Sequence, residues 1–576
     1  LPVRDFVKIM TDTQSHLCLM SESVFKHFEK ASHKRKVPLW PKGVEVWKTS
    51  DMGTYQPPRK VGPPPLKISD LAYIEYSRGS MSELRGVAIS HRTIIHQMKS
   101  LTSIISSTPD IKKGTLIRPS AALSKFRYTI LSTLDVRQSI GLVMGALFSV
   151  YSGNPLIWIH QKLTEVPGLY AHVISRARAS ILLSDYLSLK QVAYNYQSFP
   201  QLTRTFNKRV KVDLSCVKWC LINTLIVDCE FNDKLSDRWF KPLGHPHPRR
   251  IIAPMLCLNE QGGAIICMRD WIGNEDRLGC SFQKPITDEV IPNDENEDGN
   301  MGERLSEVLI DKDSLTTNTV KVVSDRPPPT SSTYDDESSK YIRVGAFGYP
   351  IPDATLAIVN PEAKILSGYD EVGEIWVDSH CISGGYWGLP DATQNIFQAE
   401  CSDYEGVLNI NFVRTGLLGF IYNGKVYVLG LYEDRINQHV TWYDRYLAIQ
   451  TKKEEEKVSS SDLGDVQSLD ENTENINQKI LMNSDIPQYR YHYAGHLVKT
   501  LVRNIPDVTD CSFFNVRVNN EYLPIAIIES PSIPASKNRQ KNTGLGIITA
   551  DPSLLNDLAI QTMKLMEKLH NVRLFC

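Results

Sequence analysis

The stretch Asp70–His91, DLAYIEYSRGSMSELRGVAISH, decides the fold of this 576-residue chain. It opens with a short apolar strand, Leu71–Tyr76. A polar turn follows, whose glycine and serine residues are Gly79, Ser80, Ser82 and Gly86. A second apolar step, Val87–Ile89, leads into a helix that we expect to begin near Ser90, with that serine as its N-cap.

This strand, turn and helix have the chemistry of a loop that grips phosphate. Glycine lets the backbone approach an anion closely, and exposed N–H groups and hydroxyls supply donors. Arg85 adds a fixed positive charge with a forked donor face. An ordinary turn after a strand is the alternative interpretation of the same residues.

Length and composition limit the class of protein. A chain of 576 residues is too long for one ordinary core, so we expect at least two domains. Apolar content of 42% and charged content of 22% are typical of a globular protein. The net charge of −1 argues against bulk attraction to nucleic acid or to an anionic membrane, since both need a basic excess.

The cysteines and the apolar runs exclude two further classes. Eleven cysteines are scattered without a CxxC pair, which favours a reducing compartment. Cys216, Cys220 and Cys229 lie in an apolar, β-rich run, and we expect buried apolar side chains there rather than metal ligands. Polar residues, glycine and proline interrupt Gly141–Ile159, so this stretch predicts a buried helix and a core strand, not a transmembrane segment.

The first 50 residues alternate between helix and strand. Helices are predicted at Val3–Met10 and Ser21–Lys30, and strands at Leu17–Met20 and Val44–Trp47. This βαβ rhythm favours a parallel sheet. It continues downstream, with helices expected at residues 91–106, 166–178 and 187–196 and a strand at 179–183.

The second half predicts strands and then a separate small unit. Gly373–Asp378 is a strand, and Phe412–Gly430 is a hairpin around the type I′ turn signal Asn423-Gly424. Beyond it, an α+β unit is expected from two helices and two strands, at residues 494–503, 555–569, 511–518 and 523–530.

We therefore expect a large N-terminal domain over residues 1–430 and a small C-terminal α+β domain over residues 431–576. Mobile insertions are predicted near residues 288–340, where the sequence is acidic or rich in Pro and Ser. A disordered insertion is predicted at 452–479. The first domain is expected to lack its beginning, and the second its end.

The opening stretch resembles the signature of adenylate-forming enzymes, LAYxxYTSGSTGxPKGV. Tyr76, Ser77, Gly79-Ser80, Arg85 and Gly86-Val87 match it in order. The departures are Arg78, Met81, Ser82 and Leu84. Five further stretches resemble the family in its order, so that the resemblance covers nearly the whole chain: 139–142, 256–260, 344–362, 373–397 and 412–430.

Within that superfamily, the chain resembles the fatty acyl-AMP ligase branch. The segment Ile310–Arg343 resembles the insertion that hinders coenzyme A use in relatives. The sequence of the opening stretch, together with Met268–Gly273 (MRDWIG), resembles the first ligase-like domain of the disco-interacting protein 2 family in its fungal form. The resemblance implies an α/β adenylate-forming fold, in which a large domain has mixed or parallel sheets packed with helices and a smaller α+β domain follows.

The resemblance also implies site residues. ATP or AMP would be held by residues of the turn and of the RTG motif: Ser77, Arg78, Gly79, Ser80, Ser82, Gly86 and Arg414. Arg85 and Glu260 would be catalytic, with Glu260 also the Mg²⁺ ligand, and Asp434 would be the hinge between the domains. Solvated arginines in a structural turn, a solvated loop carboxylate and an ordinary surface turn are the respective alternatives.

Three departures affect the chemistry. In the family's RTGDLGF the aspartate accepts both ribose hydroxyls, and here Leu417 stands in its place. Leu431 replaces the arginine of the family's GRxKD. The catalytic lysine of relatives has no visible counterpart before Cys576. Loss of charged hydrogen bonds costs about 1.5–3 kcal/mol each, so ATP affinity is expected to fall at least tens-fold.

Two hypotheses follow from the resemblance. One is a degenerate ligase fold that binds lipid or protein, with an acyl pocket lined by Ile140–Phe148. The other is an active fatty acyl-AMP ligase that transfers poorly to coenzyme A. Either would act in lipid or diacylglycerol homeostasis, with a fatty acid or other lipid and a second ligase-like domain of a longer polypeptide as partners. The family implies the cytoplasm, at the periphery of mitochondria, vacuole or endoplasmic reticulum.

Overall fold

A computed structural model describes the greater part of the chain. The described residues are 3–35, 43–51, 69–78, 83–106, 128–205, 211–268, 307–325, 340–352, 354–439, 489–518, 521–530 and 552–574. The expected insertion at 452–479 lies outside them, as do most residues of 288–340. No described helix has both the length and the apolar character needed to cross a bilayer.

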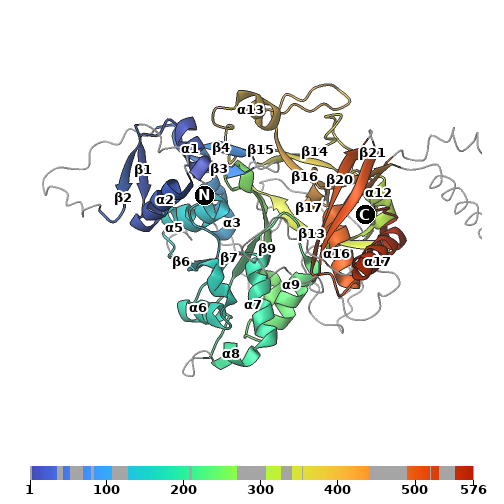
Figure 1. Cartoon of the computed structure of the whole chain (residues 1–576), viewed down its shortest axis with the longest axis horizontal. Helices are drawn as coiled ribbons and strands as arrows, with labels where there is room; N and C mark the ends of the chain where they lie inside the picture. The colour runs from blue at the N-terminus through green and yellow to red at the C-terminus, as the bar shows by residue number, and fades with distance from the viewer. Residues whose placement is uncertain are drawn as a thin grey trace, which may run out of the picture.

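The N-terminal elements form a small lobe at one end of the molecule, blue in Figure 1. It contains α1 (Val3–Asp12), β1 (Leu17–Met20), α2 (Glu22–Arg35) and β2 (Glu45–Lys48). β1 and β2 pair in parallel, which confirms the βαβ prediction for this segment.

The opening stretch forms an antiparallel hairpin followed by a helix. β3 (Leu71–Arg78) pairs with β4 (Leu84–Ser90), and α3 (His91–Ser106) follows directly. The amide of Thr93 donates to Ser90 Oγ at 3.0 Å, so Ser90 caps α3 as predicted. The placement of Gly86 in the turn was wrong: it lies in β4 opposite Tyr76. A Cβ on Gly86 would lie 2.8 Å from Tyr76 Cζ, so glycine makes room for that ring.

A mixed sheet of 13 strands carries the rest of the large body (Figure 1). Five of its strands run parallel, in the spatial order β6 (Leu156–Trp158), β5 (Ile130–Ser132), β7 (Ile181–Asp185), β8 (Trp219–Asn223) and β9 (Ile252–Leu258). The sheet then continues antiparallel through β10 (Ala264–Met268), β13 (Tyr341–Pro350), β17 (Lys425–Leu431), β16 (Val413–Tyr422), β15 (Gly373–Asp378) and β14 (Thr355–Val359).

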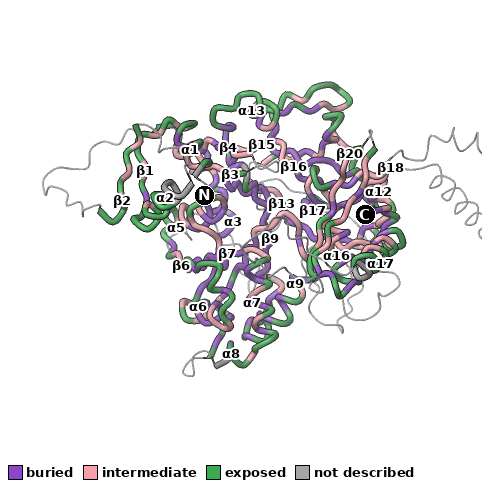
Figure 2. Tube along the Cα trace, viewed as in Figure 1, coloured by how far each residue is buried: buried purple, intermediate pink, exposed green. Residues whose placement is uncertain are grey.

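Helices cover both faces of the parallel strands. On β7, Leu182 packs against a cluster that contains α6 (Leu169–Ala177), α7 (Tyr186–Ser198) and the short π-helix η3 (Ser236–Phe240). Ile181 and Leu183, on the opposite face, pack with α3 and the π-helix η1 (Gly141–Leu147). Figure 2 shows these strands as largely buried. The remaining helices of this body are short: α5 (Phe148–Ser152), η2 (Gln161–Glu165), α8 (Pro200–Thr205), α9 (Cys229–Leu235), α10 (Pro248–Ile251), η4 (Asn259–Gln261) and α13 (Pro390–Phe397).

Part of the segment compared with the ligase insertion belongs to the sheet. β11 (Glu307–Asp311) pairs with β13, and β12 (Val322–Ser324) pairs with β11. The short helix α12 (Lys312–Thr316) follows β11 directly and contacts the C-terminal unit.

The C-terminal elements have a hydrophobic core of their own. They are β18 (Arg435–His439), β19 (Tyr489–Tyr493), α16 (Ala494–Asn504), β20 (Asp510–Val518), β21 (Glu521–Glu529) and α17 (Pro552–His570). Ile436, Leu497, Leu501 and Met566 are fully buried within one cluster there. This cluster agrees with the expected small α+β domain, and the boundary at residue 430 remains a prediction.

Three predicted local features are confirmed in detail. β15 has the predicted bounds, and Asn423 and Gly424 have φ of 50° and 73° in the turn between β16 and β17. The helix of the 141–159 stretch ends at Gly153, with φ of 70°, and β6 follows. Of the three cysteines expected to be buried, Cys220 and Cys229 are buried, and burial raises the pKa of both thiols, whereas Cys216 is only partly buried.

Candidate nucleotide and acyl site

The β3–β4 hairpin is hydrogen-bonded to the GGYW motif of residues 384–387. Trp387 N donates to Gly86 O at 2.7 Å, and Ala88 N donates to Gly385 O at 3.1 Å. Gly385 has φ of 148°, and a Cβ there would lie 2.3 Å from Thr393 Cγ2. The motif is therefore required for the packing of the hairpin, independently of any ligand.

The two arginines of the hairpin have carboxylate partners. Arg85 pairs with Glu83 at 2.5 Å, and its guanidinium carbon lies 5.4 Å from the centroid of the Tyr386 ring. Arg78 pairs with Asp5 of α1. Ser77 lies in β3 opposite Arg85, so β3 and β4 bring these two predicted phosphate contacts together. Gly79, Ser80 and Ser82 lie outside the described residues.

Arg414 stabilises β16 through an ion pair with Glu374. It donates to Glu374 Oε2 from Nε at 3.0 Å and from Nη2 at 2.7 Å, while Gly416 N donates to Glu374 Oε1 at 3.0 Å. Its guanidinium carbon lies 5.5 Å from the centroid of the Trp376 ring. Because Glu374 is 1% exposed, this bidentate pair neutralises a buried carboxylate and fixes the strand just before Leu417.

The predicted ribose position is buried and apolar. Leu417 is 1% exposed and lies in the cluster that contains Val87 and Ile89 of β4. Its cross-strand neighbour in β17 is Leu431, the second altered position. The residues that stand for the aspartate and the arginine of the family's motifs are therefore partners in the sheet. Both contribute to one apolar contact.

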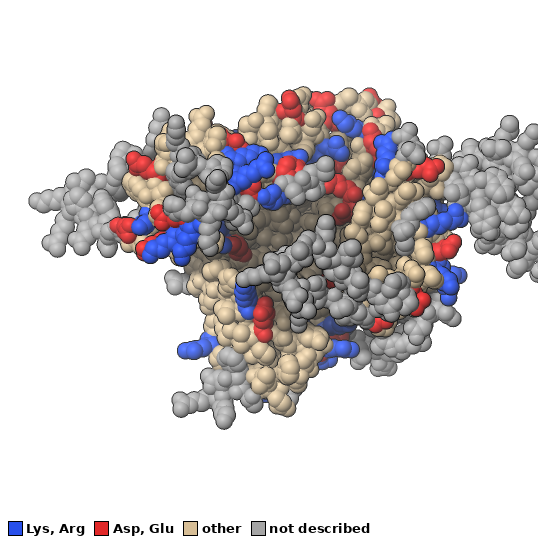
Figure 3. Space-filling model, in the orientation of Figure 1, with Lys and Arg blue, Asp and Glu red and all other residues tan. Residues whose placement is uncertain are grey.

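A cavity beside Leu431 lies between the large body and the C-terminal unit. Its lining residues are Leu225, Ile226, Gly430, Leu431, Asp434, Tyr493, Ala494 and Gly495, and its empty volume is about 380 Å³. Asp434 is the single charged side chain among them, and partial burial followed by the charge of Glu433 raises the pKa of its carboxyl. Figure 3 shows that the face of the molecule in this view is hollowed near its middle.

The predicted hinge has an anchor that the sequence analysis missed. Arg435 follows Asp434, is 8% exposed, and pairs with Glu362 of the large body at 2.6 Å. Its guanidinium carbon lies 5.1 and 4.5 Å from the ring centroids of Tyr432 and Tyr491. An arginine amid tyrosines near the hinge was the only signal of this role in the sequence.

Glu260 lies in η4 between β9 and β10, and its side chain is outside the described residues. Beside it, Ser139 Oγ donates to Asn259 Oδ1 at 2.8 Å, and Ser139 N donates to Glu75 Oε1 at 2.6 Å. Burial raises the pKa of the Glu75 carboxyl. Glu75 was missed, although a glutamate inside the apolar strand DLAYIEYS is a signal that could have identified it.

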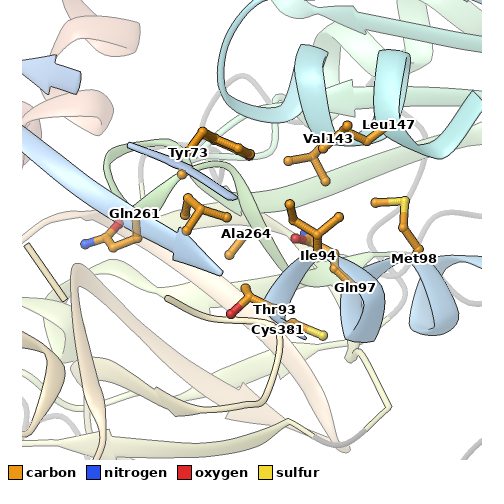
Figure 4. A pocket seen from close by; sticks show the side chains of 12 residues that line it. Tyr73, Thr93, Ile94, Gln97, Met98, Val143, Leu147, Gln261, Ala264 and Cys381 are labelled. Atoms are coloured by element: carbon orange, nitrogen blue, oxygen red, sulfur yellow. The ribbon is translucent and has the colours of Figure 1, made fainter. Parts of the chain in front are cut away.

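An apolar pocket lies between the hairpin, α3 and η1 (Figure 4). Val143 and Leu147 line it, both from the predicted acyl segment. The space enclosed is about that of one water molecule, so a larger ligand requires the lining side chains to move apart. The other lining residues are Tyr73, Ile89, Thr93, Ile94, Gln97, Met98, Gln261, Gly262, Ala264 and Cys381. Burial raises the pKa of Tyr73 to about 12, so its hydroxyl stays protonated at neutral pH.

Solved structures define the class to which this fold belongs. The structure of a fatty acyl-adenylate ligase from Legionella pneumophila, in complex with acyl adenylate and pyrophosphate, superposes with a TM-score of 0.52 at 17% identity. The match covers 98% of this chain and 74% of that one. The chain has the adenylate-forming, acyl-CoA synthetase-like fold, as predicted.

Curated relatives give a finer placement. An uncharacterized protein of Schizosaccharomyces pombe is 40% identical over 583 residues, which cover 99% of this chain and 34% of that protein. The Homeostatic regulator of DAG of Saccharomyces cerevisiae is 28% identical over 626 residues, covering 99% and 36%. Disco-interacting protein 2 of Drosophila melanogaster is 26% identical over 360 residues, covering 62% and 16%.

Residues 432–576 match the family model of the meiotically up-regulated gene 62 protein-like domain. The chain spans about a third of the length of the two fungal relatives. These matches support the resemblance to the disco-interacting protein 2 family, and the correspondence to its first ligase-like domain remains a prediction.

Proposed function

We propose that this chain is a fatty acyl-AMP ligase-like unit of a longer lipid-metabolism protein, with impaired ATP-dependent adenylation, and that it acts by binding lipid. The cross-strand pair of buried Leu417 and partly buried Leu431 carries the proposal. Leucine accepts no hydrogen bond, so a ribose placed here would lose charged bonds worth about 1.5–3 kcal/mol each.

The residues around this pair also support weak binding of ATP. No described carboxylate lines the neighbouring cavity except Asp434, which is exposed to solvent. Arg78, Arg85 and Arg414 each have a carboxylate partner already, so a phosphate would have to compete with Asp5, Glu83 or Glu374. ATP, AMP and Mg²⁺ are therefore weak ligands in this proposal.

Lipid binding is supported by the pocket between α3 and η1. Its lining is largely apolar and depends on packing, not on the ribose contacts. A fatty acyl chain is the proposed occupant. The yeast relative named Homeostatic regulator of DAG supports a role in diacylglycerol homeostasis. A place at the periphery of organelle membranes is part of the same proposal.

The test is ATP–pyrophosphate exchange with long-chain fatty acids, run beside binding of a fluorescent fatty acid to the same preparation. We expect fatty acid binding without exchange above background. Val143→Glu in the pocket should abolish binding, while Val150→Glu on the exposed surface of α5 is the matched control. Exchange that is lost in Glu260→Ala would overturn the proposal.

An active fatty acyl-AMP ligase is the second candidate. The fold and the retained Ser77–Arg85 pairing favour it. It predicts exchange that requires Mg²⁺ and forms acyl-adenylate, with poor transfer to coenzyme A. Absence of both exchange and ATP binding by calorimetry would remove it.

A further inference from the structure

A second cavity lies between α12 of the large body and the C-terminal unit. Elements far apart in the chain enclose it: α12, β13, β19, α16 and the end of α17. Its lining residues are Lys312, Asp313, Leu315, Thr316, Ile342, Tyr491, His492, Tyr493, His496, Leu497 and His570.

Four basic side chains from four elements converge on this cavity. Lys312 comes from α12, His492 from β19, His496 from α16, and His570 from the last residue of α17. Lys312 Nζ donates to Leu569 O at 2.6 Å, which ties α12 to the end of α17.

One of these side chains has a polar atom without a partner. His492 is 5% exposed, and its Nε2 has no hydrogen-bond partner among the described residues. A buried polar atom left unpaired costs free energy, so such atoms in native proteins are normally satisfied by a partner, a water or a ligand. Nε2 belongs to a residue that lines the cavity, so a molecule bound there would be its partner.

Lys312 gives the cavity one positive charge, and its three histidines are neutral near pH 7 but become cations when they bind a proton. Asp313 is its single lining carboxylate and is exposed to solvent. Burial and the nearby cations Lys312, Arg490 and Lys499 lower the pKa of His492 and of His496 to about 3. The pKa of His570 falls to about 3 through burial, Lys312 and the two other histidines. An anion among these groups would reverse this effect and draw protons onto the imidazoles.

We propose that this cavity is a binding site for a phosphate group, carried by free phosphate or by the monoester headgroup of a lipid. Several donors on separate elements suit the several acceptor oxygens of a phosphate, and a bound phosphate would join α12 to the C-terminal unit. The site is separate from the nucleotide and acyl positions, so it stands whatever the outcome of the exchange assay.

The first test is calorimetric titration of the chain with inorganic phosphate near pH 6 and near pH 7.5 at equal ionic strength. Phosphate gains a proton of its own over this range, so the imidazoles are reported by the difference between two proteins: binding should be less favoured by the lower pH in His492→Gln than in the unaltered chain, with less proton uptake. His492→Gln and Lys312→Met should each weaken binding about tenfold, as expected for loss of one charge-assisted bond. His16→Gln, an exposed histidine of the N-terminal lobe, is the control.

The second test separates the two sources of phosphate. Flotation with phosphatidylcholine vesicles that contain a phosphatidylinositol monophosphate should recover the chain, and inorganic phosphate should compete, if a lipid headgroup is the ligand. Phosphate binding without flotation would assign the site to free phosphate. No phosphate binding at either pH, or equal binding in His492→Gln and His16→Gln, would overturn the proposal. Should His492→Gln fail to fold, His570→Gln provides the same comparison from α17.

Discussion

Two cavities meet at Tyr493, and they differ in charge. On one side, Leu225, Ile226 and Leu431 line a largely apolar space at the corner where the family's motifs place ribose contacts. On the other side, Lys312 and three histidines line a basic space that no motif indicated. The retained motifs therefore identify the fold, whereas the titratable groups of the second cavity lie on elements that no motif connects.

β16 repeats this contrast over four residues. Arg414 keeps a buried bidentate pair with Glu374, whereas Leu417 contributes only apolar contact. The RTG frame is preserved because Glu374 needs a cation and the Gly416 amide needs an acceptor.

Leu417→Asp should have the largest effect. A carboxylate at a position 1% exposed, opposite Leu431, would be desolvated without a partner, and we expect a loss of about 3–5 kcal/mol in the free energy of unfolding. Urea denaturation measures it. Leu417→Met keeps the volume and should cost less than about 1.5 kcal/mol.

The double variant Leu417→Asp/Leu431→Arg tests whether the apolar corner can regain the two charges of the family's motifs. The two charges would face each other across β16 and β17, so a coupling of about 1–3 kcal/mol should recover part of the loss. ATP affinity, measured by calorimetry, should rise in the double variant if the ribose contacts are all that the site lacks. No rise would mean that the cleft is closed to nucleotide by other residues.

Arg414→Met should have the next largest effect. Removal of the cation leaves Glu374 buried and unpaired, at a cost of about 3 kcal/mol. Arg137→Met is a matched control, because Arg137 pairs with Asp135 at 2.6 Å but is largely exposed, and its loss should cost less than about 1 kcal/mol. Equal losses in both variants would contradict the structural role given to Arg414.

Acidification tests the basic cavity. The three histidines have a pKa near 6.5 when unfolded and about 3 when folded, so their contribution to stability is complete above about pH 6.5 and is lost as the pH falls toward 3. Partial exposure of His496 reduces the effect, and we expect about 2–4 kcal/mol to be lost between about pH 7 and pH 5 in phosphate-free buffer. Denaturant melts at each pH measure the slope. A slope unchanged in His570→Gln would contradict this assignment.

The sequence predicted what depends on local pattern. The cap at Ser90, the Asn423-Gly424 turn and the strand Gly373–Asp378 follow from capping, turn and alternation rules. Gly86 was misplaced because its position is set by the Tyr76 ring across the hairpin.

The candidate site was predictable only in part. Leu417 was recognised from a motif as standing in the place of the ribose aspartate. Its burial and its pairing with Leu431 required the structure and the register of β16 and β17. The basic cavity is assembled from α12, β19, α16 and α17, whose contacts no short sequence window contains. Glu75 and Arg435 likewise acquire their roles from partners distant in the chain, Ser139 and Glu362.

Asp434→Asn should have the smallest effect and addresses the one charge beside the apolar cavity. Its carboxyl pKa is raised in the folded state, so the charged carboxylate lowers the stability of the fold at neutral pH. This cost disappears as the pH falls and the carboxylate is protonated. Solvent screens this exposed group, and the variant should therefore gain no more than about 0.5 kcal/mol near pH 7 and nothing near pH 4. Glu405→Gln, at an exposed position of the large body, is the control in the same denaturant melts. A loss of stability in Asp434→Asn alone would contradict this prediction. It would show that the Asp434 carboxylate makes a stabilising interaction at the hinge, so that the cavity beside Leu431 would contain a polar contact.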